Sequence, residues 1–205
     1  MNLVKKIAAV LAVLILIFCI AGCGNVKEKA GEEVQEKTST AETSNEKMSD
    51  GKIFHAEDLV TMEEISTITG VPIVDIKHWD NDYTGLLGAT YLVEKDGYDG
   101  FTLNCYQQSY RGAADDDVTH PVFGPEVKGD YEKRKRIVEE SGSLEVVEGL
   151  GQEAYYDNVQ YILYVLYNDE YYLEVRDNYF DDPATHKAMA IKIAEKAVER
   201  LSEKL

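Results

Sequence analysis

The sequence QYILYVLYNDEYYLEVR, residues 160–176, decides the fold. Two apolar runs, 160–167 and 171–176, flank Asn168-Asp169-Glu170, whose composition is typical of a turn, so the segment predicts a β-hairpin. In the first run both alternating sets of positions are apolar: Tyr161, Leu163, Val165 and Tyr167 in one, and Ile162, Tyr164 and Leu166 in the other. A strand of this kind is covered on both faces. We therefore expect a sheet with other elements packed on each side of the hairpin.

Further short apolar runs predict strands at 73–79, 88–94, 100–107, 144–147 and 153–156. Within 100–107 the residues alternate between two faces, with Phe101, Leu103 and Cys105 on one and Thr102, Asn104 and Tyr106 on the other. The turns between the first three strands contain Asp80-Asn81-Asp82 and Asp96-Gly97. This pattern indicates an antiparallel meander.

Three helices accompany these strands. A capping box at Thr61-Met62-Glu63-Glu64 predicts a short helix that ends at Gly70, and a charged helix over about 130–140 stops at Gly142. Asp182-Pro183 begins a final helix. Its predicted apolar stripe consists of Ala184, Ala188, Ile191, Ala194, Val198, Leu201 and Leu205. The predicted fold class is α+β: a mainly antiparallel sheet of about six to seven strands, with a short N-terminal helix, a middle charged helix and a long C-terminal helix packed on it.

The N-terminus has the features of an export signal. Lys5-Lys6 precede a mostly aliphatic run, 7–20, which is shorter than the roughly 20 residues that a membrane-spanning helix needs. The run closes with Ile20-Ala21-Gly22-Cys23, which resembles the lipobox of bacterial lipoproteins. The resemblance implies cleavage before Cys23, a diacylglyceryl thioether on its sulfur with acyl chains such as palmitate, and anchoring at the extracytoplasmic face of the cell membrane. The alternative is an uncleaved apolar anchor in which Cys23 is unmodified.

These features divide the chain into a signal peptide at 1–22, a lipidated flexible tether at 23–54 and a single α+β domain at 55–205. The tether is rich in Lys, Glu, Ser, Thr and Asn and has no aromatic residue before Phe54. Such a composition cannot bury enough apolar surface to fold. As a coil, it spans about 30 Å.

Charge and cysteine content limit the partners and the chemistry. The formal net charge is −17, which disfavours binding to nucleic acids and to anionic lipid surfaces. Of the three cysteines, Cys19 leaves with the signal and Cys23 carries the lipid, so Cys105 remains alone and no intramolecular disulfide is expected. Its place on an inward strand face predicts a small buried hydrophobe rather than a nucleophile.

Acidic segments offer candidate cation ligands. Asp80-Asn81-Asp82-Tyr83-Thr84-Gly85 matches the first half of a calcium-binding loop, but the twelfth position is Tyr91 instead of a bidentate Glu. We therefore interpret it as a turn. Asp115-Asp116-Asp117, in a long loop at 109–129, and Asp181-Asp182 are interpreted as solvated loop and helix cap. No metal site or cofactor is predicted, because the histidines His55, His78, His120 and His186 are isolated.

Two clusters could bind a partner. Lys133-Arg134-Lys135-Arg136 could meet an anionic partner, although a solvated helix face balanced by Glu132, Glu139 and Glu140 is the favoured interpretation. The tyrosines between Tyr155 and Tyr179 could form a stacking platform, but strand propensity accounts for most of them. No grouping of residues typical of nucleophilic catalysis is present, so no catalytic residue is predicted.

The segment Gly149-Leu150-Gly151-Gln152-Glu153-Ala154-Tyr155, together with the helices that open and close the folded part, resembles small α+β lipoprotein domains and extracytoplasmic sensor domains of kinases. The resemblance implies the fold but no active site, and the sensor-type members carry paired cysteines where this chain has Cys105 alone. The predicted function is therefore a non-enzymatic, lipid-anchored domain that binds a ligand or partner as a sensor or accessory protein. The alternative is an envelope hydrolase or metal-dependent protein whose site is built from acidic loops.

Overall fold

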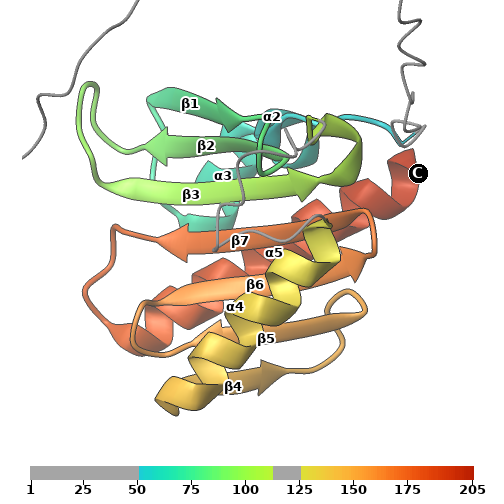
Figure 1. Cartoon of the computed structure of the whole chain (residues 1–205). Coiled ribbons are helices and arrows are strands. Elements are labelled where there is room, and N and C mark those ends of the chain that lie inside the picture. Colours follow the sequence, from blue (N-terminus) through green and yellow to red (C-terminus); the bar gives the residue numbers. More distant parts are fainter. Residues whose placement is uncertain (1–50, 113–125) are drawn as a thin grey trace, which may run out of the picture. The chain divides into compact units, whose positions relative to one another are not determined.

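The computed structural model describes residues 51–112 and 126–205 and contains a seven-stranded sheet (Figure 1). The strands are β1 (Asp75–Asn81), β2 (Leu86–Leu92), β3 (Gly100–Gln107), β4 (Leu144–Val147), β5 (Glu153–Asp157), β6 (Ile162–Asn168) and β7 (Tyr171–Asp177). They lie in the order β1-β2-β3-β7-β6-β5-β4, and all neighbouring strands are antiparallel. The helices are α2 (Ala56–Leu59), α3 (Met62–Thr69), α4 (Val127–Ser141) and α5 (Pro183–Lys204), with the 3₁₀ turn η1 (Gln108–Tyr110). The predicted α+β class is confirmed.

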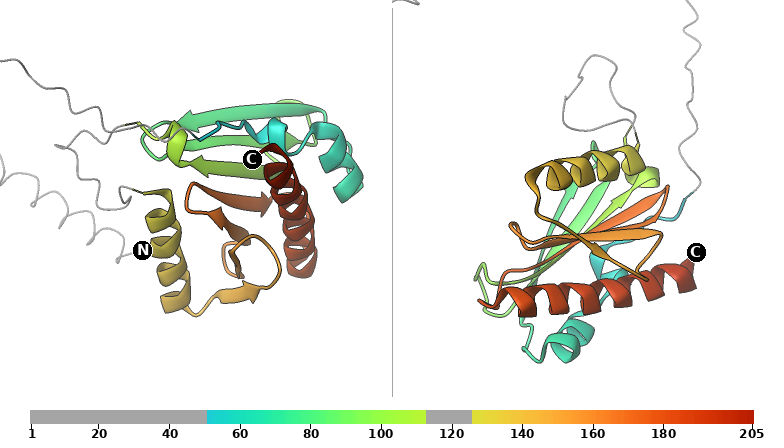
Figure 2. Two further views of the ribbon diagram at one scale, coloured as in Figure 1. Left: turned by 90° about the vertical axis from the view of Figure 1, so that its right-hand side faces the viewer. Right: turned by 90° about the horizontal axis from the view of Figure 1, so that it is seen from below.

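Helices cover the sheet from both sides. Figure 2 shows α4 and α5 on opposite sides of the strands, and α2 and α3 lie on the α5 side. The interior strand β6 is buried on both faces, with Leu163 and Val165 toward α5 and Tyr164 and Leu166 toward α4. The prediction that this strand is covered on both faces is confirmed.

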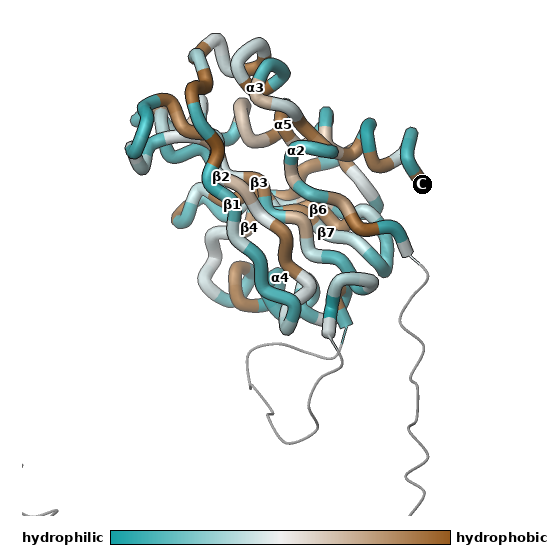
Figure 3. The backbone as a smooth tube through the Cα atoms, turned by 90° about the horizontal axis from the view of Figure 1, so that it is seen from above, coloured by the Kyte–Doolittle hydropathy of each residue, from teal (hydrophilic) through white to brown (hydrophobic). Residues whose placement is uncertain are grey.

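The core on the α5 face is mainly aliphatic, with Leu103, Leu163, Leu173 and Val175 fully buried in the sheet. The predicted stripe of α5 is wrong at Ala184, Ala188 and Leu205, which are exposed. The buried stripe consists of His186, Ala190, Ile193, Ala194, Ala197 and Leu201. The alanines let the helix lie close to β6 and β7, so larger residues at the margin of the stripe are only partly buried. In Figure 3, hydrophobic and hydrophilic segments alternate along α5.

The core on the α4 face is made largely of tyrosines. Tyr106, Tyr131, Tyr155, Tyr164 and Tyr172 are all buried there. The rings of Tyr106 and Tyr172 stack with centroids 4.2 Å apart, and those of Tyr155 and Tyr164 stack at 4.8 Å. This face therefore buries several hydroxyl groups along with apolar ring surface.

Several predicted boundaries shift. β1 extends to Asn81, and the turn runs from Asn81 to Gly85, because the Asn81 side chain accepts a hydrogen bond from the Thr84 amide and Gly85 takes a positive φ of 74°. Helix α4 begins at Val127, earlier than predicted, and ends at Gly142 as predicted. The four-residue helix α2 was not predicted because it is too short to show a helical period.

Residues 52–54, assigned to the tether from composition, lie against the sheet. The Gln107 side chain accepts a hydrogen bond from the Phe54 amide and donates one to the Phe54 carbonyl, both at 2.7 Å. The Tyr171 hydroxyl donates to the Lys52 carbonyl at 2.6 Å. The Cys23 lipidation site, the signal peptide and most of the tether lie outside the described residues. Among the residues that are described, the search for a helix long and apolar enough to cross a membrane found none.

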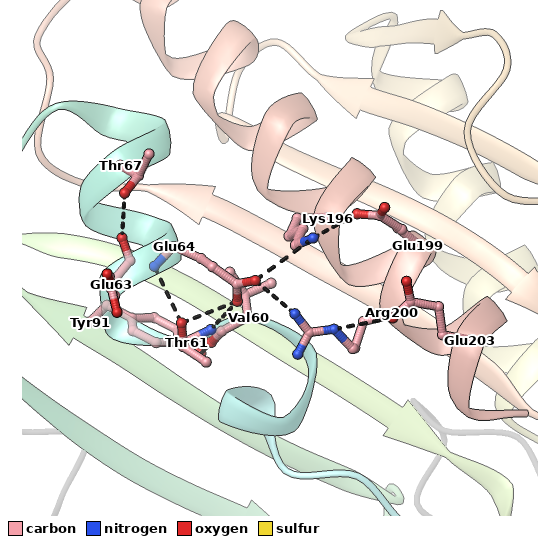
Figure 4. Close-up of polar contacts among 10 residues, drawn as sticks. All are labelled: Val60, Thr61, Glu63, Glu64, Thr67, Tyr91, Lys196, Glu199, Arg200 and Glu203. Atoms are coloured by element: carbon pink, nitrogen blue, oxygen red, sulfur yellow. Dashed lines mark hydrogen bonds and ion pairs between the residues drawn. The ribbon is translucent and has the colours of Figure 1, made fainter.

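Glu64 joins α3 to α5 (Figure 4). Its carboxylate accepts hydrogen bonds from the Thr61 amide at 2.9 Å and from Arg200 at 2.7 Å, while Lys196 lies 3.7 Å away. Burial raises the pKa of this carboxyl, but the hydrogen bonds from Thr61 and the charges of Arg200 and Lys196 outweigh burial and lower the pKa overall. The predicted capping box is thus confirmed and also serves as a contact between helices.

Candidate functional site

Among the described residues, a helix covers the α4 face of the sheet over only part of its width. Helix α4 packs on β4, β6 and β7, whereas no helix of the described ranges lies in front of β1, β2 and β3 in Figure 1. Two adjacent rows of paired residues cross the uncovered part. The first row contains Trp79, Gly88, Asn104 and Glu174, and the second contains Lys77, Thr90, Thr102 and Arg176. Apart from Trp79 and Gly88, the side chains of both rows are polar.

A hollow of about 280 Å³ lies on these rows, and we call it the Trp79 hollow. It is lined by Trp79, Thr102, Asn104, Ile162, Glu174, Arg176 and Asn178. The indole of Trp79 lies against Gly88, where a Cβ atom would be 2.5 Å from the indole nitrogen. Any larger residue at position 88 would therefore displace the ring. A second hollow, of about 260 Å³, lies beside Trp79 next to His55, Glu57 and His78.

Glu174 places a buried carboxylate at one side of the Trp79 hollow. Its side chain is only 11% exposed, and the Arg134 Nε atom lies 3.2 Å from its Oε1 atom. The Oε2 atom accepts hydrogen bonds from the Tyr106 hydroxyl at 3.1 Å and the Asn104 amide at 3.3 Å. Burial and then the Glu174 charge raise the pKa of Tyr106, which keeps this hydroxyl protonated as a donor. Asn104 Oδ1 is buried without a hydrogen-bond donor among the described residues, whereas Glu174 Oε1 has Arg134 as its ion-pair partner.

Arg176 provides the opposite charge in the next row. It lies two residues from Glu174 on the same face of β7, a spacing of about 7 Å along a strand. Its side chain is partly buried, and it makes no hydrogen bond or ion pair with any residue in 51–112 or 126–205. A partly buried cation normally has a partner. Among the described residues, the Trp79 hollow therefore combines an unpaired acceptor, Asn104 Oδ1, in one row with an unpaired guanidinium in the next.

The acidic candidates from the sequence do not meet there. Asp80 accepts a hydrogen bond from the Tyr110 hydroxyl at 2.8 Å and lines the second hollow, while the Asp82 carbonyl accepts from the Gly85 and Gly112 amides in the turn. Asp115-Asp116-Asp117 lie outside the described residues. Asp182 caps α5 by accepting from the Thr185 amide at 2.8 Å, as predicted. Within the part of the chain that the structure describes, no group of three His, Cys, Asp or Glu side chains could hold a metal ion.

The described histidines each have structural neighbours. The His78 Nε2 atom lies 3.2 Å from Glu57 on the surface. The buried His186 lies 3.4 Å from Asp177 and stacks on Tyr161, with ring centroids 4.9 Å apart. His55 precedes α2, and His120 lies outside the described residues.

The basic cluster on α4 is not the solvated face that its sequence favoured. Arg134 reaches the sheet, where it contacts Glu174 and donates to the Tyr172 hydroxyl at 3.2 Å. Lys135 forms an ion pair with Glu153 at the start of β5. The interpretation based on neighbouring helical turns is therefore wrong for these two residues, because the turns of α4 place them over carboxylates of the sheet.

The tyrosines and Cys105 belong to the core. Tyr155, Tyr156, Tyr164, Tyr171 and Tyr172 are buried, so they offer no stacking platform. Cys105 is fully buried, and burial raises the pKa of its thiol. Its predicted role as a small hydrophobe is consistent with this position.

Sequence reasoning missed the Trp79 hollow. The signals were the single tryptophan, the glycine at position 88 within a strand, and Asn104 on the outward side of 100–107. A glycine inside a strand often marks a close approach of another group. Only the register shows that all three lie in one row with Glu174.

Comparisons with protein-family models, curated proteins and solved structures gave no match for this chain, so the site is interpreted from its own geometry.

Proposed function

We propose that the protein is a non-enzymatic binding domain, anchored by lipid at the extracytoplasmic face of the cell membrane, that takes a small polar ligand in the Trp79 hollow. The observation that carries the binding proposal is Arg176, a partly buried cation that has no partner among the described residues. It lies beside the half-buried indole of Trp79 and the buried Asn104 Oδ1, which has no donor among the described residues. Binding sites for small molecules combine such a concave surface with a few polar groups that fix orientation.

The size of the hollow supports a small ligand. Its volume of about 280 Å³ is just below the range for ligand pockets, about 300 to 1,000 Å³. No helix of the described residues covers the site on the side of β1 to β3. We therefore expect a ligand of the size of a monosaccharide or an amino acid. It would bind reversibly from solution rather than stay bound as a permanent cofactor.

The anchoring proposal rests on the lipobox at Ile20-Ala21-Gly22-Cys23. Two acyl chains on Cys23 would provide stable membrane attachment, which a single chain does not. We expect a palmitate analogue to label the wild-type protein in the membrane fraction and not to label Cys23→Ala. Equal labelling of the two proteins would refute the anchor.

Ligand binding at the hollow can be measured by tryptophan fluorescence because Trp79 is the only tryptophan in the chain. We would titrate the full-length protein in detergent micelles with neutral sugars, uronates, dicarboxylates and amino acids, and follow tryptophan emission. At least one compound should give a saturable change that Arg176→Gln weakens. Arg136→Gln, the same exchange at an exposed position of α4, serves as the control. A flat response to every class would contradict the binding function.

A further inference from the structure

We infer that the ligand of the Trp79 hollow is a free α-amino acid in its zwitterionic form, an inference that rests on the proposed function. The two rows that cross the hollow lack opposite kinds of hydrogen-bond partner: one row lacks a donor and the other lacks an acceptor. Among the described residues, Asn104 Oδ1 lacks a hydrogen-bond donor, and it lies with the Glu174 carboxylate in the row next to Arg176, which lacks an acceptor. A molecule that satisfies both rows carries a donor cation and an acceptor anion a short distance apart.

The register between β3 and β7 sets which residues of the two rows lie opposite each other. Asn104 lies directly opposite Glu174, and Thr102 lies directly opposite Arg176. Consecutive residues on one face of a strand are about 7 Å apart, which leaves room for an α-ammonium and an α-carboxylate between the two rows. The carboxylate would pair with Arg176, whose planar guanidinium suits bidentate binding. The ammonium would donate to Asn104 Oδ1, which lies in the same row as the negatively charged Glu174 carboxylate.

Glu174 and Arg176 do not neutralise each other. The charge of Glu174 is instead compensated by Arg134 of α4, with 3.2 Å between Arg134 Nε and Glu174 Oε1. The Thr102 and Thr90 hydroxyl groups form a hydrogen bond with each other, with 3.0 Å between their oxygen atoms. Arg176 therefore remains available for an external anion.

The overall charge favours a zwitterion over a simple anion. The chain has a formal charge of −17, so an anionic ligand meets repulsion on approach. A zwitterion is neutral as a whole and avoids this repulsion, yet it still presents a carboxylate to Arg176. A simple cation would leave Arg176 without a partner.

Trp79 takes part in the binding step. Asn104 Oδ1 is shielded from solvent, and both it and the indole nitrogen lie next to Gly88. An ammonium group can reach this oxygen only if the indole moves outward. The movement changes the surroundings of the single tryptophan and provides the signal, and the displaced ring can cover the side chain of the amino acid.

The test uses the full-length protein in detergent micelles. Each common α-amino acid is added singly while tryptophan emission is followed, and the best binder is compared with its N-acetyl derivative, which lacks the ammonium, and its carboxamide, which lacks the carboxylate. We expect saturable binding of at least one amino acid and a loss of roughly tenfold to a hundredfold for each derivative, the range for a hydrogen bond to a charged group.

Arg176→Gln should weaken binding of the amino acid by a similar factor and leave binding of the carboxamide unchanged, whereas Arg136→Gln should change neither. An unaltered melting curve of Arg176→Gln would show that the variant folds. Equal binding of the amino acid and its derivatives, or no response to any amino acid, would overturn the inference. If a sugar, uronate or dicarboxylate gave a response that depended on Arg176, the proposed binding function would stand and only the ligand class would be wrong.

Discussion

On the α5 face the sheet meets mainly aliphatic side chains and alanines, although Tyr91, Tyr156 and Tyr171 are also buried there. On the α4 face it meets tyrosines, the Arg134–Glu174 ion pair and, beyond the helix, polar side chains that no described helix covers. Burying aliphatic surface stabilises a fold without leaving polar groups that need partners. Both faces nevertheless contain buried polar atoms without a hydrogen-bond partner among the described residues: Asn104 Oδ1 and the Tyr155 hydroxyl on the α4 face, and the Tyr156 hydroxyl on the α5 face. The comparison indicates that aliphatic packing on the α5 face supplies most of the stability, and we propose that the polar rows beside α4 supply the binding groups.

The largest expected effect appears in alkaline solution and is centred on the tyrosines of the α4 face, with Tyr91, Tyr156 and Tyr171 of the α5 face adding to it because burial also raises their pKa. Burial raises the pKa of Tyr106, Tyr131, Tyr155, Tyr164 and Tyr172 from the ordinary value of 10.0, and that of Tyr164 reaches about 12. Below pH 10 these groups are neutral in both states. Above it they ionise first in the unfolded chain, so each removes about 1.4 kcal/mol of stability per pH unit until the pH passes its folded pKa.

Urea unfolding at a series of pH values measures this loss. The free energy of unfolding should fall by several kcal/mol between about pH 10 and pH 11. Tyr164→Phe should reduce the loss of unfolding free energy per pH unit by the contribution of one tyrosine. A stability that stayed constant over this interval would contradict the burial of the tyrosine cluster.

The hydroxyls on the α4 face should differ from one another. Tyr106→Phe removes a donor to the Glu174 carboxylate and should lower the free energy of unfolding by about 1.5–3 kcal/mol. Tyr155→Phe removes a buried hydroxyl that has no partner and should be neutral or stabilising. Equilibrium unfolding of the two variants checks this, and equal losses would show that both hydroxyls are hydrogen-bonded.

A matched pair of substitutions on α5 tests the packing of the other face. Ala194 is fully buried and Ala188 is exposed, although both belonged to the predicted stripe. Ala194→Leu should cost about 1–3 kcal/mol by overpacking, and Ala188→Leu should change stability by less than about 0.5 kcal/mol. Thermal melting of the two variants measures the difference. A larger loss of stability for Ala188→Leu than for Ala194→Leu would show that Ala188 is buried, as the sequence predicted.

The smallest expected effect concerns Glu64, at the margin of the α5 face. Because its folded pKa lies below its ordinary value, the contribution of Glu64 is present above the ordinary value of 4.5 and is lost as the pH falls through the folded pKa. Glu64→Gln should cost about 0.5 kcal/mol near neutral pH and nothing in acid, since the side chain is 27% exposed. Glu63→Gln, at an exposed neighbour, is the control for unfolding measured across this pH range. A loss for Glu64→Gln that persisted in acid would assign the effect to packing.

The sequence predicted the elements of the fold better than the site. Alternation in 100–107 and apolar residues in both registers of 160–167 follow from local physics, so the strands and the two-sided packing could be inferred. The stripe of α5 could not, because alanines at 190, 194 and 197 lie at the closest approach only once the sheet is in place. The Trp79 hollow depends on the strand order β1-β2-β3-β7, which joins residues 79 and 174 across four strands. No local pattern contains that information.

The most direct test of the difference between the faces uses two adjacent residues of β3. Leu103 points to the α5 face and is fully buried, and Asn104 points to the Trp79 hollow. In urea unfolding, Leu103→Ala should lower the free energy of unfolding by about 2–5 kcal/mol. Asn104→Ala should change it by less than about 1 kcal/mol, because it removes one long hydrogen bond together with an unpartnered oxygen. A loss for Asn104→Ala as large as that for Leu103→Ala would show that the polar row is part of the stabilising core and would contradict its assignment to binding.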